Sequence, residues 1–243
     1  MKKSAAIKRY LQPLLHTPLH PQWLTSTGGH HLLEALGKIS PGALVLDIGC
    51  ATQWPRKHLH KDVSYIGLDY YQTATGWYRT QPDIFGSALQ LPLDADSADV
   101  VLLLDVMEHL ENPDTVMSEI HRVLRANGKL LLQVPFLYPL HDEPRDFWRL
   151  TIHGLNELGS RHGLKPEVIY PRGTPAETSG LLRNLALGHL ALTLLRNRSP
   201  FMLMLPFLAA GIVANNIGSW LLSWLEKDSG FMPYSYFVIF RKA

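Results

Sequence analysis

The feature that most constrains this chain is a short apolar run that ends in a carboxylate and then turns at a glycine. Residues 43–47 read Ala-Leu-Val-Leu-Asp, and Ile48 and Gly49 follow directly. A continuous apolar run of this length is typical of a strand that is buried on both faces of a parallel sheet. At Gly49 the chain must turn sharply and approach a ligand closely. We therefore expect a parallel α/β sheet with a binding site at this turn.

The same pattern recurs along the chain. Further apolar runs occupy residues 63–69, 99–105 and 129–135, and the first two of these also end in an aspartate. A helix is expected between the last two runs, because Asn112-Pro113 suit a cap and a first turn, while Asn127-Gly128 suit a stop. Strands that alternate with helices predict right-handed crossovers and a doubly wound sheet.

The bulk composition limits the function classes. A formal net charge of +2 is too small to indicate a nucleic-acid partner. Cys50 is the single cysteine, which excludes an internal disulfide framework and a multi-cysteine zinc site. We therefore predict no metal site and a reducing, cytoplasmic setting. Lys8 and Arg9 interrupt the segment after the basic start, so we expect no signal peptide.

Three aspartates mark one edge of the predicted sheet. Ligands of an open parallel sheet bind beyond the carboxyl ends of the strands, where Asp47, Asp69 and Asp105 end their runs. Asp69 follows Asp47 by 22 residues, a spacing that suits a carboxylate holding ribose hydroxyls. The residues after Gly49 do not supply the G-x-G-x-x-G fingerprint of a dehydrogenase. The pattern predicts a nucleotide-type cofactor.

Four segments resemble, in order, the motifs of class I S-adenosylmethionine-dependent methyltransferases of the type 11 kind. They are residues 45–50, 86–93, 97–110 and 123–130. The resemblance covers roughly residues 40–170. It implies a transferase of the Rossmann-like methyltransferase fold, with a doubly wound, mostly parallel seven-stranded α/β sheet and S-adenosylmethionine as the cofactor.

The resemblance also implies roles for single residues. Asp47 and Gly49 would border the methionine part of the cofactor, and Asp69 would bind its ribose. Asp105 would face the amino group or the transferred methyl. The full predicted cofactor-binding set is Asp47, Gly49, Cys50, Asp69, Tyr70, Ser87, Ala88, Leu89 and Asp105.

Two positions depart from the family pattern. Ala51 stands where a glycine is usual, and alanine costs little there unless the backbone needs a positive φ. Ser87 stands where an aspartate is usual, and its hydroxyl is a weaker acceptor for the adenine amine. These departures favour the alternative of a non-catalytic methyltransferase-like binding module.

Residues 136–151 form the densest chemical cluster, with one histidine, three acids, two arginines and four aromatics. His141 with Asp142 or Asp146 can make an oriented base, and the arginines can bind phosphate or carboxylate. His109 belongs to a Glu-His pair that also reads as helix-start packing. We predict catalytic roles for His141, Asp142 and His109, and acceptor binding by Arg145, Asp146 and Arg149.

The acceptor is predicted from the same segment. Residues 136–151 resemble a stretch of methyltransferases associated with bacterial glycan biosynthesis, which implies O-methylation of a small-molecule or lipid-linked glycan acceptor. The alternative is a quinone or another small apolar acceptor.

Residues 199–225 contain no charged residue. The stretch is long enough to span a bilayer, but Pro206 and Asn215-Asn216 divide it, so two helices forming an apolar cap are the better interpretation. Arg196 and Arg198 precede it and Lys227 follows, which fits peripheral contact with the inner membrane face. A lid on the acceptor pocket and a dimer interface are the alternatives.

The expected domain organisation follows from these segments. We predict an N-terminal helical segment over residues 1–40, an α/β core over 41–170, an apolar helical insertion over 171–233 and the final strand of the core sheet over 234–243.

Overall fold

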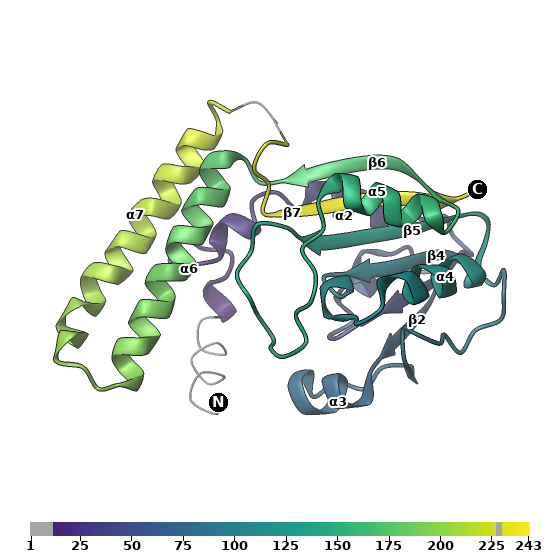
Figure 1. Cartoon of the computed structure of the whole chain (residues 1–243), viewed down its shortest axis with the longest axis horizontal. Helices are drawn as coiled ribbons and strands as arrows, with labels where there is room; N and C mark the ends of the chain where they lie inside the picture. The colour runs from purple at the N-terminus through teal and green to yellow at the C-terminus, as the bar shows by residue number, and fades with distance from the viewer. Residues whose placement is uncertain (1–11, 227–229) are drawn as a thin grey trace. The chain divides into compact units, whose positions relative to one another are not determined.

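The computed structural model describes residues 12–226 and 230–243. Lys8, Arg9 and Lys227, which entered the sequence argument, lie outside these ranges. A seven-stranded sheet with the order β3-β2-β1-β4-β5-β7-β6 dominates the molecule and confirms the predicted doubly wound fold (Figure 1). The strands are β1 (Leu44–Ile48), β2 (Ser64–Asp69), β3 (Ile84–Phe85), β4 (Ala98–Leu104), β5 (Leu124–Pro135), β6 (Leu164–Arg172) and β7 (Ser235–Lys242).

The strand pairing gathers the carboxyl ends of the central strands at one edge. β1 pairs in parallel with β2 and β4, β4 pairs in parallel with β5, and β2 pairs in parallel with β3. β7 is antiparallel to β5. The turns after β1, β2 and β4, where the predicted site residues lie, therefore share one edge of the sheet.

Helices cover both faces of the sheet, and each face has its own core. Helices α4 (Pro113–Val123) and α5 (Ile152–Arg161) pack with Leu46, Leu103 and Leu132 on one face. Helix α2 (His30–Gly37) packs with Val45 and Leu102 on the other. Burial on both faces explains why these strands read as continuous apolar runs.

Side-chain caps start both helices, and Asn112 is the cap that the sequence indicates. Asn112 Oδ1 accepts a hydrogen bond of 3.1 Å from Thr115 N, and Thr151 Oγ1 accepts one of 3.1 Å from Gly154 N. The end of α4 differs from the expectation, because the helix stops at Val123 and Leu124 already belongs to β5. Leu124 pairs with Ala98 of β4 and is fully buried, so packing overrides the later stop signal.

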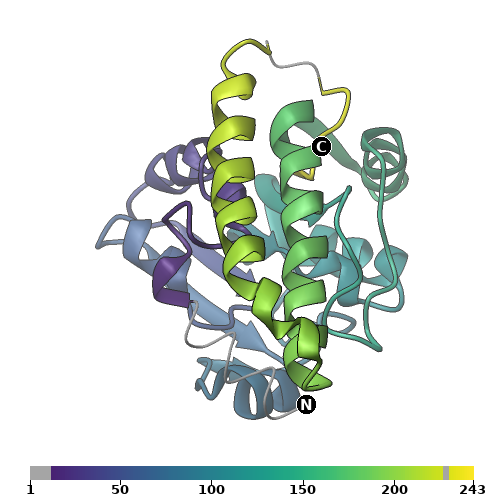
Figure 2. The same cartoon turned by 90° about the vertical axis from the view of Figure 1, so that its left-hand side faces the viewer.

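A second compact unit contains residues 1–29, 137–139 and 171–234, of which the structure describes residues 12–29, 137–139, 171–226 and 230–234. Its main elements are α6 (Pro175–Arg196) and α7 (Leu205–Ser223), which lie side by side as a hairpin (Figure 2). Leu24, Leu181 and Tyr234 form its small core. Thr174 and Glu177 make a capping box at the start of α6.

The remaining elements are short. They are α3 (Tyr71–Thr73), η1 (Gln12–Leu14), η2 (Trp23–Thr25), η3 (Trp54–His58), the π-helical turn η4 (Ala74–Tyr78), η5 (Met107–His109) and η6 (Pro200–Met204). Of these, η4 and η5 contribute residues to the candidate site described next.

Candidate functional site

The turn after β1 is held against the end of β2 by its own backbone. Gly49 N and Cys50 N both donate to Leu68 O, at 2.8 and 3.2 Å. Gly49 has a φ of 71°, and a Cβ atom there would lie 2.5 Å from Val106 Cγ2, so only glycine fits. Ala51 also has a positive φ, 44°. The usual glycine at that position is therefore replaced by a residue for which this conformation is strained.

Asp69 ties β2 to the same turn. Its Oδ2 accepts 2.9 Å from Ala51 N, and its Oδ1 accepts 2.7 Å from Tyr70 N. Burial raises the pKa of Asp69, although these two hydrogen bonds act to lower it. The carboxylate therefore stands at the carboxyl end of β2, as the sequence indicates, in a geometry set by backbone amides. Its contact with a ribose stays a prediction.

Asp47 and Cys50 lie beneath the turn. Asp47 is 2% exposed and accepts a 2.5 Å hydrogen bond from Tyr65 Oη. Burial raises the pKa of Asp47 to about 7 and, with nearby carboxylates, raises the pKa of Cys50 to about 12. Cys50 is therefore a protonated thiol at neutral pH, and Asp47 links β1 to Tyr65 of β2.

The segment predicted to flank the adenine follows β3. Gly86 N donates 3.0 Å to Asp69 O, which joins the segment to the end of β2. Ser87 Oγ accepts 3.2 Å from Leu89 N, so the hydroxyl holds its own loop. Ala88 is buried, while the Leu89 side chain is 40% exposed and accessible to a ligand.

Asp105 lies at the end of β4 with a φ of 54°. Its Oδ2 accepts from Gln133 Nε2 of β5. Tyr78 shows that the predicted acids share one environment. Burial raises the pKa of the Tyr78 hydroxyl, and the charges of Asp142, Asp69, Asp105 and Glu108, in that order, raise it further. Acids from three loops, those after β2, β4 and β5, thus act on one tyrosine.

The segment after β5 orients His141. Asp146 Oδ2 accepts 2.9 Å from His141 N and lies 3.4 Å from His141 Nδ1. Arg149 binds both oxygens of Asp146, at 2.6 and 2.7 Å. Burial acts to raise the pKa of Asp146, but these hydrogen bonds and charges hold it below its usual value. Asp146, one of the two acids weighed as the partner of His141, lies at ion-pair distance from it.

The same segment is fastened to the loop after β4. Phe147 N donates 2.8 Å to Glu108 O, and Trp148 Nε1 donates 2.8 Å to Leu110 O. The Arg145 carbonyl contacts His109 Nδ1, while its guanidinium lies 5.4 Å from the centre of the Tyr70 ring. Two of the three predicted catalytic residues, His109 and His141, consequently meet, with ring centres 4.9 Å apart.

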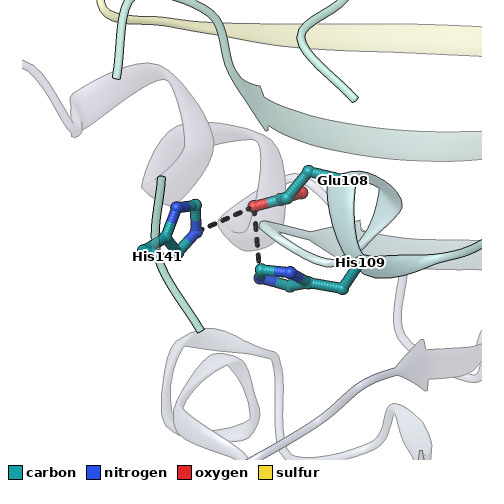
Figure 3. Close-up of side chains that lie close together, drawn as sticks. All are labelled: Glu108, His109 and His141. Atoms are coloured by element: carbon teal, nitrogen blue, oxygen red, sulfur yellow. Dashed lines mark ion pairs between the residues drawn. The ribbon is translucent and has the colours of Figure 1, made fainter. Parts of the chain in front are cut away.

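Glu108 occupies the centre of this arrangement (Figure 3). Its side chain is 1% exposed, and Oε1 lies 3.8 Å from His109 Nε2 and 3.7 Å from His141 Nε2. In the sequence, the Glu-His pair fits both helix-start packing and catalysis. The position of Glu108 shortly after the end of β4 is a sequence signal for a site residue. Its burial depends on the segment after β5, which is distant in the sequence.

Comparisons with known proteins find similar methyltransferase sequences. Residues 46–132 match the family model "Methyltransferase domain". A "Probable S-adenosylmethionine-dependent methyltransferase" of Mycolicibacterium smegmatis is 37% identical over 100 residues, which are 39% of this chain and 38% of that protein. A "Demethylmenaquinone methyltransferase" of Mycobacterium tuberculosis is 30% identical over 98 residues, covering 39% and 42%. The matches thus span less than half of each relative.

Solved structures support the fold. The cyclase SpnF superposes with a TM-score of 0.55 at 16% identity, covering 87% of this chain and 79% of that chain. Methyltransferase structures superpose with TM-scores of 0.54 at 19% and 14% identity. Likeness at this level of sequence identity shows a shared Rossmann-like sheet. The reaction has to be argued from the residues of the site.

Proposed function

We propose that this chain, whose residues 46–132 match a methyltransferase domain, is an enzyme that transfers a methyl group from S-adenosylmethionine to an oxygen of a lipid or lipid-linked acceptor. S-adenosylmethionine is the cofactor of that domain and fold. When bound, it supplies an electrophilic methyl on a sulfonium. The chain must then position the acceptor and remove its proton.

The residues present fit this cofactor. Asp69 stands at the end of β2, where a carboxylate can accept two hydrogen bonds from a ribose diol, and Asp105 stands at the end of β4. The acids gathered around Tyr78 make a negative environment that suits a cationic sulfonium and amino group. The link from Asp69 Oδ2 to Ala51 N is the observation that carries the proposal, because it joins the turn and the ribose carboxylate into one preformed cradle.

The acceptor side is proposed to lie beyond β4 and β5. His109 and His141 meet there, and Asp146 orients His141 while engaging Arg149. Asp142 and Arg145 remain predicted contributors. The proximity of two imidazoles and a buried carboxylate supports proton removal from an acceptor hydroxyl at this cluster.

A lipid acceptor is favoured by the apolar hairpin. In η6, α7 and the turn after α7 the structure exposes large apolar side chains, among them Phe201, Leu203, Phe207, Trp224 and Leu225. By length and composition Pro200–Ser223 is able to cross a membrane, and 17% of its apolar window is buried. Buried core helices pass the same test of composition, but this stretch is mostly exposed. One relative is named for an apolar quinone acceptor, which agrees with this choice.

We infer that the hairpin contacts an anionic membrane surface. The sequence has no acidic residue between Glu177 and Glu226, while Arg183, Arg196 and Arg198 are exposed. Arginines beside exposed aromatic and aliphatic side chains suit the headgroup region of a bilayer. A glycan acceptor is predicted from the resemblance of residues 136–151 alone. We keep a lipid-linked glycan as one form of the proposed acceptor.

Calorimetric titration with S-adenosylmethionine tests the proposed cofactor. Wild-type protein is expected to bind it, and Asp69→Ala is expected to weaken binding at least tenfold, because the ribose carboxylate and the anchor of Ala51 N are both lost. Asp62→Asn, in the exposed loop before β2, is the matched control and should leave affinity unchanged. A folded wild-type protein that shows no binding would instead support the non-catalytic module.

A further inference from the structure

Glu108 is a buried carboxylate with an unusual environment. Its side chain is 1% exposed, and neither Oε1 nor Oε2 accepts a hydrogen bond from any residue that the structure describes. A buried carboxylate normally has hydrogen-bond donors, because desolvation without them is costly. Both nearby imidazole nitrogens are too far from Oε1 for direct hydrogen bonds, at 3.7 and 3.8 Å. The arrangement therefore leaves room for a cation between the three side chains.

His109 presents a lone pair to this space. Its Nδ1 contacts the carbonyl oxygen of Arg145, and a carbonyl only accepts hydrogen bonds. Nδ1 therefore carries the proton, and in the neutral ring Nε2 has the free lone pair that faces Glu108. A histidine whose Nδ1–H is bonded to a backbone carbonyl while Nε2 faces a carboxylate is the arrangement of a metal ligand.

His141 completes the set from a different loop. Its Nε2 faces Glu108 Oε1, and its Nδ1 lies beside the buried carboxylate of Asp146. A carboxylate behind a ligating imidazole is the usual outer contact of histidines at metal sites. Arg149 holds Asp146 in place, so this support is rigid.

We propose that Glu108, His109 and His141 bind one divalent transition-metal ion. Their ligand atoms all lie within 4.8 Å of one another (Figure 3). Metal–ligand bonds of about 2.0–2.2 Å place neighbouring ligand atoms roughly 3.0–3.5 Å apart, so the most distant pair must approach by up to about 1.3–1.8 Å, which is less than about 1 Å for each side chain. Two imidazoles and one carboxylate suit zinc or iron(II) better than magnesium or calcium.

Three protein ligands leave a coordination position for an acceptor oxygen. A metal-bound hydroxyl would lose its proton to solvent water more easily than a free one, which would prepare its oxygen for methylation. This last step rests on the proposed function, whereas metal binding itself does not. A ligating His141 Nε2 is unable to serve as a free base, so the metal and base roles are mutually exclusive.

Zinc binding to the full chain tests the proposal. Protein freed of metal by chelation and dialysis is titrated with Zn²⁺ in competition with a chromophoric chelator. One equivalent is expected to bind with submicromolar affinity, and His141→Ala and Glu108→Gln are each expected to weaken binding at least tenfold. X-ray absorption of the zinc-loaded protein should show nitrogen and oxygen ligands at about 2.0–2.1 Å.

His153→Ala, an exposed histidine on α5, is the matched control and should bind zinc like the wild type. His141 is partly exposed, so its variant is informative even where Glu108→Gln fails to fold. If wild-type protein binds zinc no more tightly than His141→Ala, the proposal is wrong, and the three side chains form an acid–base cluster without a metal. Zinc binding without S-adenosylmethionine binding would defeat the proposed function and leave the metal site standing.

Discussion

Ala51 holds a strained backbone in the turn that carries the cofactor proposal. Its φ of 44° lies in the left-handed region, which costs an alanine roughly 1 kcal/mol relative to glycine. Ala51→Gly is therefore expected to raise the free energy of unfolding by about 0.5–1 kcal/mol, less the added entropy of the unfolded chain. Chemical denaturation measures the change.

Ala126→Gly provides the comparison for that substitution. Ala126 is exposed in β5 and is not among the residues with a positive φ, so glycine there should lower stability. Equal destabilisation by both substitutions would show that the turn after β1 does not require the left-handed conformation.

Asp47 makes stability depend on pH. Burial raises its pKa to about 7, against about 3.9 in an unfolded chain. Between these values the folded protein keeps a proton that the unfolded chain has released, so Asp47 reduces stability as the pH rises from about 4 to about 7. Asp47→Asn keeps a hydrogen-bond acceptor for Tyr65 Oη and should remove this pH dependence of stability.

The free energy of unfolding of both proteins at pH 5 and pH 8 measures this effect. From pH 5 to pH 8, the free energy of unfolding of Asp47→Asn should rise relative to that of the wild type by on the order of 2–3 kcal/mol. The same change with pH in both proteins would mean that Asp47 is ionised in the folded state throughout this range.

At the scale of residues, the sequence predicted where the site residues lie along the strands better than it predicted how buried they are. Asp47, Asp69 and Asp105 stand at strand ends, as the apolar runs indicate. The burial of Glu108 was beyond prediction, because the segment that covers it lies more than 30 positions later and is fastened by Phe147 N. Local patterns carry no information about such a contact.

At the scale of elements, the predicted strands were the most reliable feature, because continuous apolar runs reflect burial on both faces. The stop of α4 was less reliable. Asn127 does have a positive φ of 62°, but it lies within β5, since Leu124 is already paired with Ala98. Tertiary packing thus moved the boundary by several residues.

The hairpin shows how asparagines are accommodated in an apolar element. Asn216 is fully buried, donates to the carbonyls of Pro18 and His20 at 2.8 and 2.9 Å, and accepts 2.7 Å from Asn184. Asn216→Leu removes the hydrogen bonds to these two carbonyls and to the Asn184 amide, and it should destabilise this unit by roughly 2–4 kcal/mol. Hydrogen exchange of the α6 and α7 amides measures the loss.

Asn197→Ala, at the exposed end of α6, serves as the control for Asn216→Leu and should change exchange little. Unchanged protection in Asn216→Leu would show that apolar packing alone holds the two helices together. In the sequence these asparagines argue against a membrane span, and in the structure their polar groups bond to partners within the same unit.

At the scale of the whole molecule, two units with different surfaces share one chain. The α/β unit carries the residues proposed for chemistry, and the hairpin unit carries most of the exposed large apolar side chains. An apolar surface of this kind needs a partner in water. The proposed partner is an anionic bilayer, because residues 178–225 contain arginines and no acidic residue.

Co-sedimentation with vesicles tests the membrane contact. Phe201, Leu203 and Phe207 are 64%, 84% and 76% exposed, and changing all three to serine should weaken binding to anionic vesicles roughly 100-fold or more. Leu33→Ser with Leu140→Ser, exposed apolar positions of the other unit, should not. Wild-type binding should fall in neutral vesicles and at high salt, because the arginines act through screened charge. A lipid-free wild-type dimer that the triple variant breaks would assign the surface to a second copy of the chain instead.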